Sequence, residues 1–283
     1  MKIQTLSVVV GNRSCNATCP FCVSACTPQA NLPINVNWRN FKKACRLAQI
    51  GEATTVLLTG KGEPTLHPQL ISGYLDCLEE FQFPFIELQT NGIQIGNNKI
   101  KDYYLSKWYQ NGLTTICLSA VHYWQDMNRK IYGNNYSDLK TTVKKLHDIG
   151  FTVRLSIMML KGYVDTPAEL NEIIGFCKTH KIKQLTVRPI TCPEGEANAT
   201  SQWILEHALD QNQLMDIRDF LQANGDEVLH LSHGATVYDY YGQNICLANC
   251  LTTNKTTEDI RQIIFSPDGT LSYDWKYKGA VLL

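Results

Sequence analysis

The sequence of 283 residues lacks the features that mark several broad classes of protein. No apolar run is long enough to span a bilayer, so we expect no membrane partner. The opening residues 1–6 do not follow the plan of a signal peptide, and we expect a cytoplasmic protein. Basic and acidic residues balance at 26 each, whereas a nucleic-acid binder usually carries a basic excess. This balance argues against a nucleic-acid partner.

Internal repeats, low-complexity segments and long linkers are also missing. A chain of this length with 44% hydrophobic residues fits one large domain, or a domain with a small extension. Cysteine, in contrast, is plentiful at eleven residues. In a cytoplasmic protein, so many cysteines favour reduced thiols and a metal centre over disulfides.

Three of these cysteines, Cys15, Cys19 and Cys22, form a C-x3-C-x2-C pattern directly after the apolar run 6–10. Thiolates are soft ligands that suit iron–sulfur clusters and zinc, and three of them in one loop can converge on one centre. A closed four-cysteine site needs one more ligand. A cluster held by this loop would therefore keep one iron free for another ligand.

Zinc binding and redox chemistry are the alternatives for this loop. Structural zinc usually needs a second C-x2-C pair, and the sequence offers only Cys246-x3-Cys250 at a distance. A thioredoxin-like pair of Cys19 and Cys22 should open a helix in a smaller domain, and it leaves Cys15 unexplained. The spacing favours the cluster.

The other cysteines are interpreted more simply. Cys26 as a fourth ligand would close the open iron, so we interpret it as a small buried residue. Cys192, Cys246 and Cys250 could form an auxiliary site with an incomplete ligand set, and the sequence leaves this question open.

Short apolar runs alternate with longer amphipathic stretches up to residue 225, which predicts six β-α units. The expected strands are 6–10, 54–59, 85–89, 114–119, 151–159 and 184–189. The expected helices are 38–50, 68–81, 99–110, 137–149, 167–179 and 203–222. Strands and helices in this alternation imply an α/β fold with a parallel sheet and right-handed crossovers.

Residues 226–283 differ in character and read as a short β-rich extension of the domain formed by residues 1–225. Four strand-like pieces occur there, at 228–232, 236–241, 262–265 and 271–275. The turn Pro267-Asp268-Gly269 predicts a hairpin between the last two. We expect this extension to pack near the open side of the domain.

Functional groups of parallel α/β folds collect at the carboxyl ends of the strands. After the second expected strand comes Gly60-Lys61-Gly62-Glu63-Pro64, where glycines let the backbone approach a ligand closely. An ordinary turn is the alternative. Arg154 lies within a strand, where its charge is costly to bury without an anion from a ligand or from a structural glutamate. The same argument makes Arg188 point to an anionic substrate group.

The cysteine loop with Phe21, the Gly-x-Gly-Glu-Pro stretch and the polar strand ends, taken in order, resemble the radical S-adenosylmethionine (SAM) superfamily over about residues 3–190. The resemblance implies a partial (β/α)6 barrel of the TIM type, too short for the full eight units. It implies a [4Fe–4S] cluster on Cys15, Cys19 and Cys22, with SAM chelated to the open iron. Reductive cleavage of SAM would give a 5′-deoxyadenosyl radical that abstracts hydrogen from a substrate.

The resemblance also implies roles for particular residues. The implied SAM-binding residues are Phe21, Gly60, Gly62, Glu63, Asn91, Ser119, Arg154 and Ile190. The implied substrate contacts are Thr90, Lys161 and Arg188. An electron donor such as flavodoxin or ferredoxin is the implied protein partner.

In motif order, the chain is most similar to the molybdenum-cofactor branch of the superfamily. It departs from that branch at Val8 and Leu57, where the branch carries arginines, and in lacking its C-terminal cluster cysteines. GTP rearrangement is therefore not implied. We predict an enzyme acting on a small molecule or nucleotide. A radical SAM enzyme that modifies a peptide or RNA, and a non-catalytic iron–sulfur or zinc protein, are the alternatives.

Overall fold

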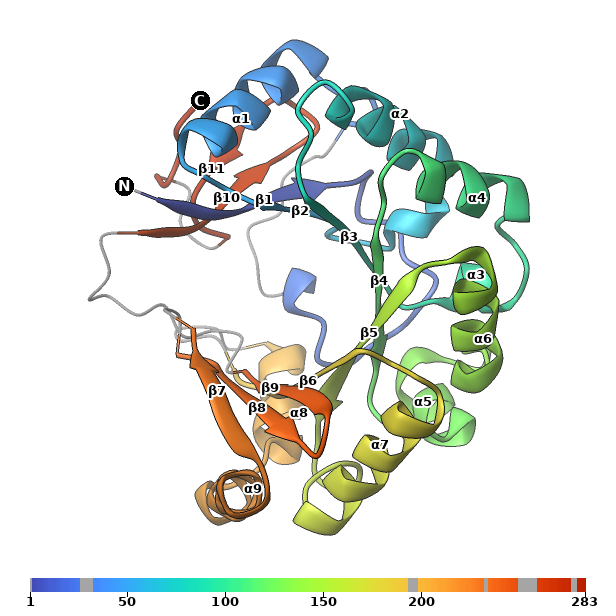
Figure 1. The fold of residues 1–283 in the computed structure, drawn as a ribbon, viewed down its shortest axis with the longest axis vertical. Helices are drawn as coiled ribbons and strands as arrows, with labels where there is room; N and C mark the ends of the chain where they lie inside the picture. Colours follow the sequence, from blue (N-terminus) through green and yellow to red (C-terminus); the bar gives the residue numbers. More distant parts are fainter. Residues whose placement is uncertain (1, 26–32, 193–197, 232–233, 249–258, 276–278) are drawn as a thin grey trace.

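A computed structural model describes residues 2–25, 33–192, 198–231, 234–248, 259–275 and 279–283. Within these ranges, one eleven-stranded sheet curves round in the order β11-β10-β1-β2-β3-β4-β5-β6-β9-β8-β7, and helices cover its outer face (Figure 1). The two ends of the strand order do not pair, so the barrel stays open on one side (Figure 1). The predicted partial barrel is confirmed.

Six parallel strands form the centre of the sheet. They are β1 (Ile3–Val9), β2 (Thr55–Thr59), β3 (Phe85–Thr90), β4 (Thr115–Ala120), β5 (Thr152–Met159) and β6 (Gln184–Pro189). All six were expected from the sequence, because runs of buried apolar residues between turn signals are typical of parallel strands.

The helices that follow these strands agree with the expected pattern in five units. They are α1 (Trp38–Ile50), α2 (Pro68–Leu78), α4 (Asp102–Gln110), α6 (Leu139–Ile149) and α7 (Pro167–Thr179). Shorter elements that the sequence did not predict are η1 (Val23–Ala25), η2 (Pro64–Leu66), α3 (Ile93–Gly96) and α5 (Gln125–Tyr132).

The single helix expected at 203–222 is wrong. Two helices lie there, α8 (Ala199–His207) and α9 (Gln211–Asn224). Ala208 leaves the helical region of backbone space, and Asp210 starts α9 with a capping box in which its side chain accepts from Gln213 N and Gln213 reaches back to its backbone. A capping box supplies acceptors for the first backbone N–H groups of a helix. The box at Asp210 therefore favours the start of a new helix over the continuation of α8.

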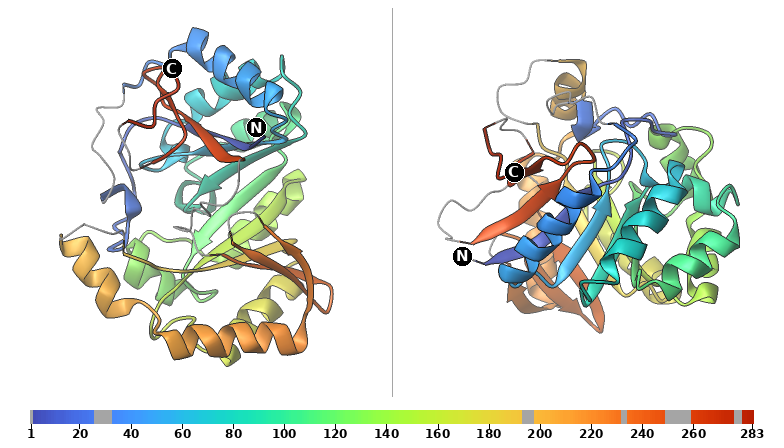
Figure 2. Two further views of the ribbon diagram at one scale, coloured as in Figure 1. Left: turned by 90° about the vertical axis from the view of Figure 1, so that its left-hand side faces the viewer. Right: turned by 90° about the horizontal axis from the view of Figure 1, so that it is seen from above.

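The extension adds strands to both edges of the parallel sheet (Figures 1 and 2). On one edge β9 (Gln243–Leu247) pairs parallel with β6 and continues into β8 (Thr236–Tyr240) and β7 (Asp226–His230). On the other edge β10 (Ile260–Phe265) pairs parallel with β1, and β11 (Leu271–Ser272) forms the predicted hairpin with it. The boundary at residue 225 itself stays a prediction.

The hairpin turn has the expected chemistry. Gly269 has a φ of +96°, a conformation that favours glycine, and its N–H donates to the Ser266 carbonyl over 2.9 Å. Among the residues that the structure describes, no helix is both long enough and apolar enough to cross a membrane.

Aromatic side chains join the extension to the barrel core. The fully buried Phe265 of β10 contacts Phe41 of α1 with ring centroids 5.1 Å apart, and Tyr74 of α2 at 6.5 Å. Aromatic pairs at such distances add to the free energy gained from burying their area. The extension therefore shares one hydrophobic core with the barrel.

We predict that Phe265→Ala destabilises the whole chain by about 3–5 kcal/mol, because it leaves a cavity in this shared core. Urea denaturation followed by circular dichroism should show one transition at a lower midpoint. Tyr241→Ala, at a side chain that is 75% exposed, is the control and should leave the midpoint almost unchanged. A separate early transition in the Phe265 variant would contradict the shared core.

Candidate active site

A pocket of about 240 Å³ lies at the carboxyl ends of the parallel strands. All three cysteines of the predicted cluster loop line it. So do seven of the eight predicted SAM-binding residues: Phe21, Gly60, Gly62, Glu63, Asn91, Ser119 and Ile190. The fold thus gathers loops that are far apart in the sequence at one place, as parallel strands require.

The cysteine loop runs from β1 into η1. Cys15 is exposed, Cys19 and Cys22 are half-buried, and the Cys22 N–H donates to the Cys19 carbonyl over 3.2 Å. Burial raises the pKa of Cys19 to about 12. Cys19 therefore stays protonated at neutral pH unless a bound metal takes up the thiolate charge.

The glycine stretch after β2 packs directly against this loop. A Cβ atom on Gly62 would lie 2.2 Å from the Ser14 carbonyl oxygen, and the Glu63 N–H donates to that same oxygen over 2.9 Å. Only glycine permits such a close approach of two backbones. The Gly60–Gly62 segment therefore sets the position of the residue before Cys15.

The Glu63 carboxylate is buried and holds two strand ends together. It accepts hydrogen bonds from the Thr65 hydroxyl and N–H, from the Thr90 hydroxyl over 2.5 Å and from the Asn91 N–H over 2.9 Å. Burial raises the pKa of Glu63, and these four donors oppose that rise. Donors from two strand ends therefore hold the Glu63 side chain in place.

Thr90 was predicted to contact substrate, and it does line the pocket. Its hydroxyl, however, donates to Glu63 and accepts from the Gly92 N–H over 3.0 Å. A hydroxyl has a single proton to donate. The geometry therefore gives Thr90 a structural role and does not support the predicted substrate contact.

Asn91 bridges the loops after β1 and β3. Its amide donates to the Asn16 side-chain oxygen over 2.8 Å and lies 4.0 Å from the Cys15 sulfur, while its own oxygen accepts from the Ile93 N–H. Asn91 thus lies at the pocket wall beside the first cysteine, and its contact with a cofactor stays a prediction.

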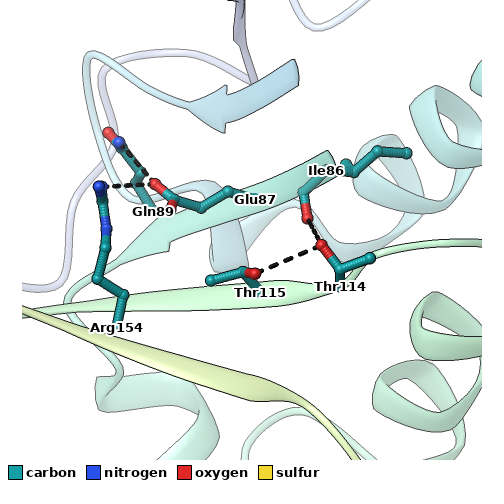
Figure 3. Close-up of polar contacts among 6 residues, drawn as sticks. All are labelled: Ile86, Glu87, Gln89, Thr114, Thr115 and Arg154. Carbon is teal, nitrogen blue, oxygen red and sulfur yellow. Dashed lines mark hydrogen bonds and ion pairs between the residues drawn. The ribbon is translucent and has the colours of Figure 1, made fainter. Parts of the chain in front are cut away.

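The remaining predicted residues lie elsewhere. Arg154 does not line this pocket, and its guanidinium pairs with Glu87 over 2.7 Å (Figure 3). A structural glutamate was one of the two alternatives left open for Arg154, and Glu87 is such a partner. The position of Arg154 outside the pocket does not support SAM binding by this residue. Lys161 is exposed on the loop after β5 and lines neither cavity. Arg188 lines a second cavity, toward the amino ends of the strands.

Sequence reasoning missed Tyr132, which also lines the pocket. Tyr132 is 3% exposed, packs edge-on against Phe21 at 6.3 Å, and its hydroxyl has no hydrogen-bond partner. Its carbonyl accepts from the Thr18 N–H inside the cysteine loop. No local signal marked it, because the short helix α5 that carries it was not predicted.

The donor set fits an iron–sulfur cluster better than a single metal ion. In the part of the chain described, no three His, Cys, Asp or Glu side chains are grouped closely enough to hold one ion. A [4Fe–4S] cluster instead takes each cysteine on a different iron, which suits thiols spread around a pocket. Cys26 and Cys250 lie outside the described residues, so their roles stay predictions, and so does the auxiliary site with Cys192 and Cys246; Cys246 is a free thiol.

These features define a partial barrel with a cysteine-lined pocket at the carboxyl ends of its strands. Residues 9–177 match the family model of the radical SAM superfamily, and the chain belongs to this superfamily. Its members use a [4Fe–4S] cluster and SAM and require a reductant and a substrate. A comparison with curated proteins finds no match in sequence.

Solved structures share the fold at low sequence identity. SuiB of Streptococcus suis has a TM-score of 0.64 at 15% identity, over 96% of this chain and 60% of SuiB. A radical SAM methyltransferase from Sphaerobacter thermophilus has a TM-score of 0.54 at 14% identity, over 77% of this chain and 63% of that one. The coproporphyrinogen III oxidase HemN of Escherichia coli has a TM-score of 0.50 at 14% identity, over 80% of this chain and 54% of HemN. The chain thus spans about 60% of the length of SuiB.

We predict that Gly62→Ala lowers the iron and labile sulfide bound after anaerobic reconstitution severalfold, because the new Cβ atom would displace the backbone at Ser14. Gly175→Ala is the matched control, since a Cβ atom there meets nothing within 4 Å. Equal iron content in the two variants would show that the contact between the two loops does not position the cysteines.

Proposed function

We propose that this chain is a radical SAM enzyme that abstracts hydrogen from a small molecule or nucleotide bound inside its barrel. The observation that carries the proposal is the single pocket lined by Cys15, Cys19, Cys22 and the glycine stretch. A purely structural or sensory cluster would not need the glycine stretch beside it.

Different residues of this chain would hold the cluster, bind SAM and contact the adenine base. Cys15, Cys19 and Cys22 would hold the cluster, and the backbone of Gly60–Gly62 would face the amino end of SAM. When bound, the two cofactors supply one-electron reductive cleavage of SAM. Ile190 is 3% exposed and gives the pocket an apolar wall against which an adenine base would pack.

A second cavity of about 690 Å³ lies in the barrel beneath the pocket, and Gln89 lines both. Small-molecule sites typically have volumes of roughly 300–1,000 Å³. A cavity of this size next to the SAM pocket favours a small substrate over a peptide or RNA. We propose flavodoxin or ferredoxin as the electron donor.

The protein should contain iron and sulfide, and under reducing, anaerobic conditions it should convert SAM to 5′-deoxyadenosine, slowly without substrate. Cys19→Ala should lower this rate at least about a hundredfold, because the cluster loses one of its three ligands. Chromatographic measurement of 5′-deoxyadenosine, together with iron and sulfide analysis, tests both statements.

Cys77→Ala is the matched control, since Cys77 lies on α2 away from the pocket, and it should behave like the wild type. Bound zinc without labile sulfide in the wild type would overturn the proposal in favour of a zinc protein. A loaded cluster without SAM cleavage would favour a non-catalytic iron–sulfur protein.

A further inference from the structure

The cavity beneath the SAM pocket has an uneven charge. Its charged lining residues are three arginines and one glutamate: Arg154, Arg188, Arg261 and Glu87. The rest of the lining is mainly threonine, glutamine and apolar side chains. A chain with no net charge therefore has a positive interior at this point.

The carboxylate of Glu87, the one glutamate of this lining, already has partners within the protein. Glu87 is 7% exposed, pairs with Arg154 over 2.7 Å and accepts from the Gln89 side chain over 3.0 Å (Figure 3). A buried ion pair of this kind largely compensates its own two charges. Glu87 thus neutralises Arg154 and is not available to the other arginines of the cavity.

Arg188 differs from Arg154 in having no such partner. Among the described residues its side chain makes no hydrogen bond or ion pair, and its Nε is buried without a partner. Burial raises the pKa of the nearby Cys246 thiol, and the charge of Arg188 opposes that rise. A thiol that stays protonated at neutral pH cannot neutralise a guanidinium.

Leaving a guanidinium partly buried and unpaired is costly, and a bound anion removes that cost. Arg188 lies in β6, level with Met158 of β5, and Met158 lines the SAM pocket. The backbone of Arg188 thus lies level with a residue of the SAM pocket, while its side chain lines the cavity below. Its planar fork matches a carboxylate or a phosphate in two parallel hydrogen bonds.

We propose that the substrate carries a carboxylate or phosphate group, which Arg188 binds inside the barrel. This inference rests on the proposed function, since it names the substrate class for the same site. It requires no SAM to be present, so the two proposals can fail separately.

Anion binding can be measured by the shift in melting temperature of the full chain, in the absence of SAM and at constant ionic strength. The probes are benzoate and phenyl phosphate, with benzyl alcohol as the neutral compound. We expect at least one anion to stabilise the wild type and benzyl alcohol to have no effect. Whichever of benzoate and phenyl phosphate binds more tightly indicates whether the substrate carries a carboxylate or a phosphate.

Arg188→Gln should weaken the binding of that anion by about tenfold or more, because it removes charge-assisted hydrogen bonds. Arg46→Gln, on the exposed face of α1, is the matched control and should bind like the wild type. Equal affinity in the wild type and Arg188→Gln, or equal effects of the charged and neutral probes, would overturn the proposal.

A separate observation concerns Tyr132. A buried hydroxyl without a partner is rare, because leaving it unpaired costs free energy. This one belongs to a side chain that lines the pocket with Cys19 and Cys22. We infer that the Tyr132 hydroxyl donates a hydrogen bond to a sulfur atom of the cluster and so tunes its reduction potential.

Tyr132→Phe should shift the midpoint potential of the reconstituted cluster to more negative values, since hydrogen bonds to sulfur stabilise the reduced form. Tyr136→Phe is the control, because the Tyr136 hydroxyl already donates to the Ser119 carbonyl over 2.8 Å. Potentials are read by redox titration followed by electron paramagnetic resonance. An unchanged potential in Tyr132→Phe would overturn the inference.

The metal-free chain gives a second measurement. There the Tyr132 hydroxyl has no partner to lose, so Tyr132→Phe should be as stable as the wild type or more so. Tyr136→Phe should be less stable, since it loses a bond to Ser119. Destabilisation of the metal-free Tyr132 variant would show that its hydroxyl has a protein partner and would also overturn the inference.

Discussion

The site depends on one buried carboxylate. Glu63 accepts hydrogen bonds from Thr65, Thr90 and Asn91, and so fixes the loop after β2 to the end of β3. Because its own N–H donates to Ser14, the same residue also holds the cysteine loop. A carboxylate in the interior is stable only when donors surround it, and here those donors come from two different strand ends. The loops that would bind the cluster and SAM are thus held in position before either arrives.

The two cavities have different chemistry. The upper one is lined mostly by thiols, glycines and apolar side chains, which suits a cluster and an adenine. The lower one is polar and positive, which suits a substrate with an anionic group. Gln89, which also contacts Glu87, lies between them. A substrate with its anion at Arg188 would place its other end near the SAM pocket.

The strands of the extension enlarge the sheet of a barrel that has only six β-α units. Strands β9 and β10 pair parallel with β6 and β1, so the last residues of the chain complete the sheet that the first residues begin. The cavity depends on them, because Asn244, Cys246, Arg261 and Gln262 line it. The extension is therefore part of the site's architecture, and its shared aromatic core with α1 and α2 gives a physical reason for its place.

The sequence by itself determined the cofactor chemistry and the six central strands, because cysteine spacing, glycine turns and apolar runs are local signals. It also placed Gly62 and Glu63 at the site. Only the tertiary structure decided that Glu87 pairs with Arg154, that the Thr90 hydroxyl donates to Glu63, and that β9 and β10 extend the sheet at its two edges. These contacts join residues far apart in the chain, and neither partner carries a local mark of the other. For the same reason the free guanidinium of Arg188 and the unpaired hydroxyl of Tyr132 became visible only after folding.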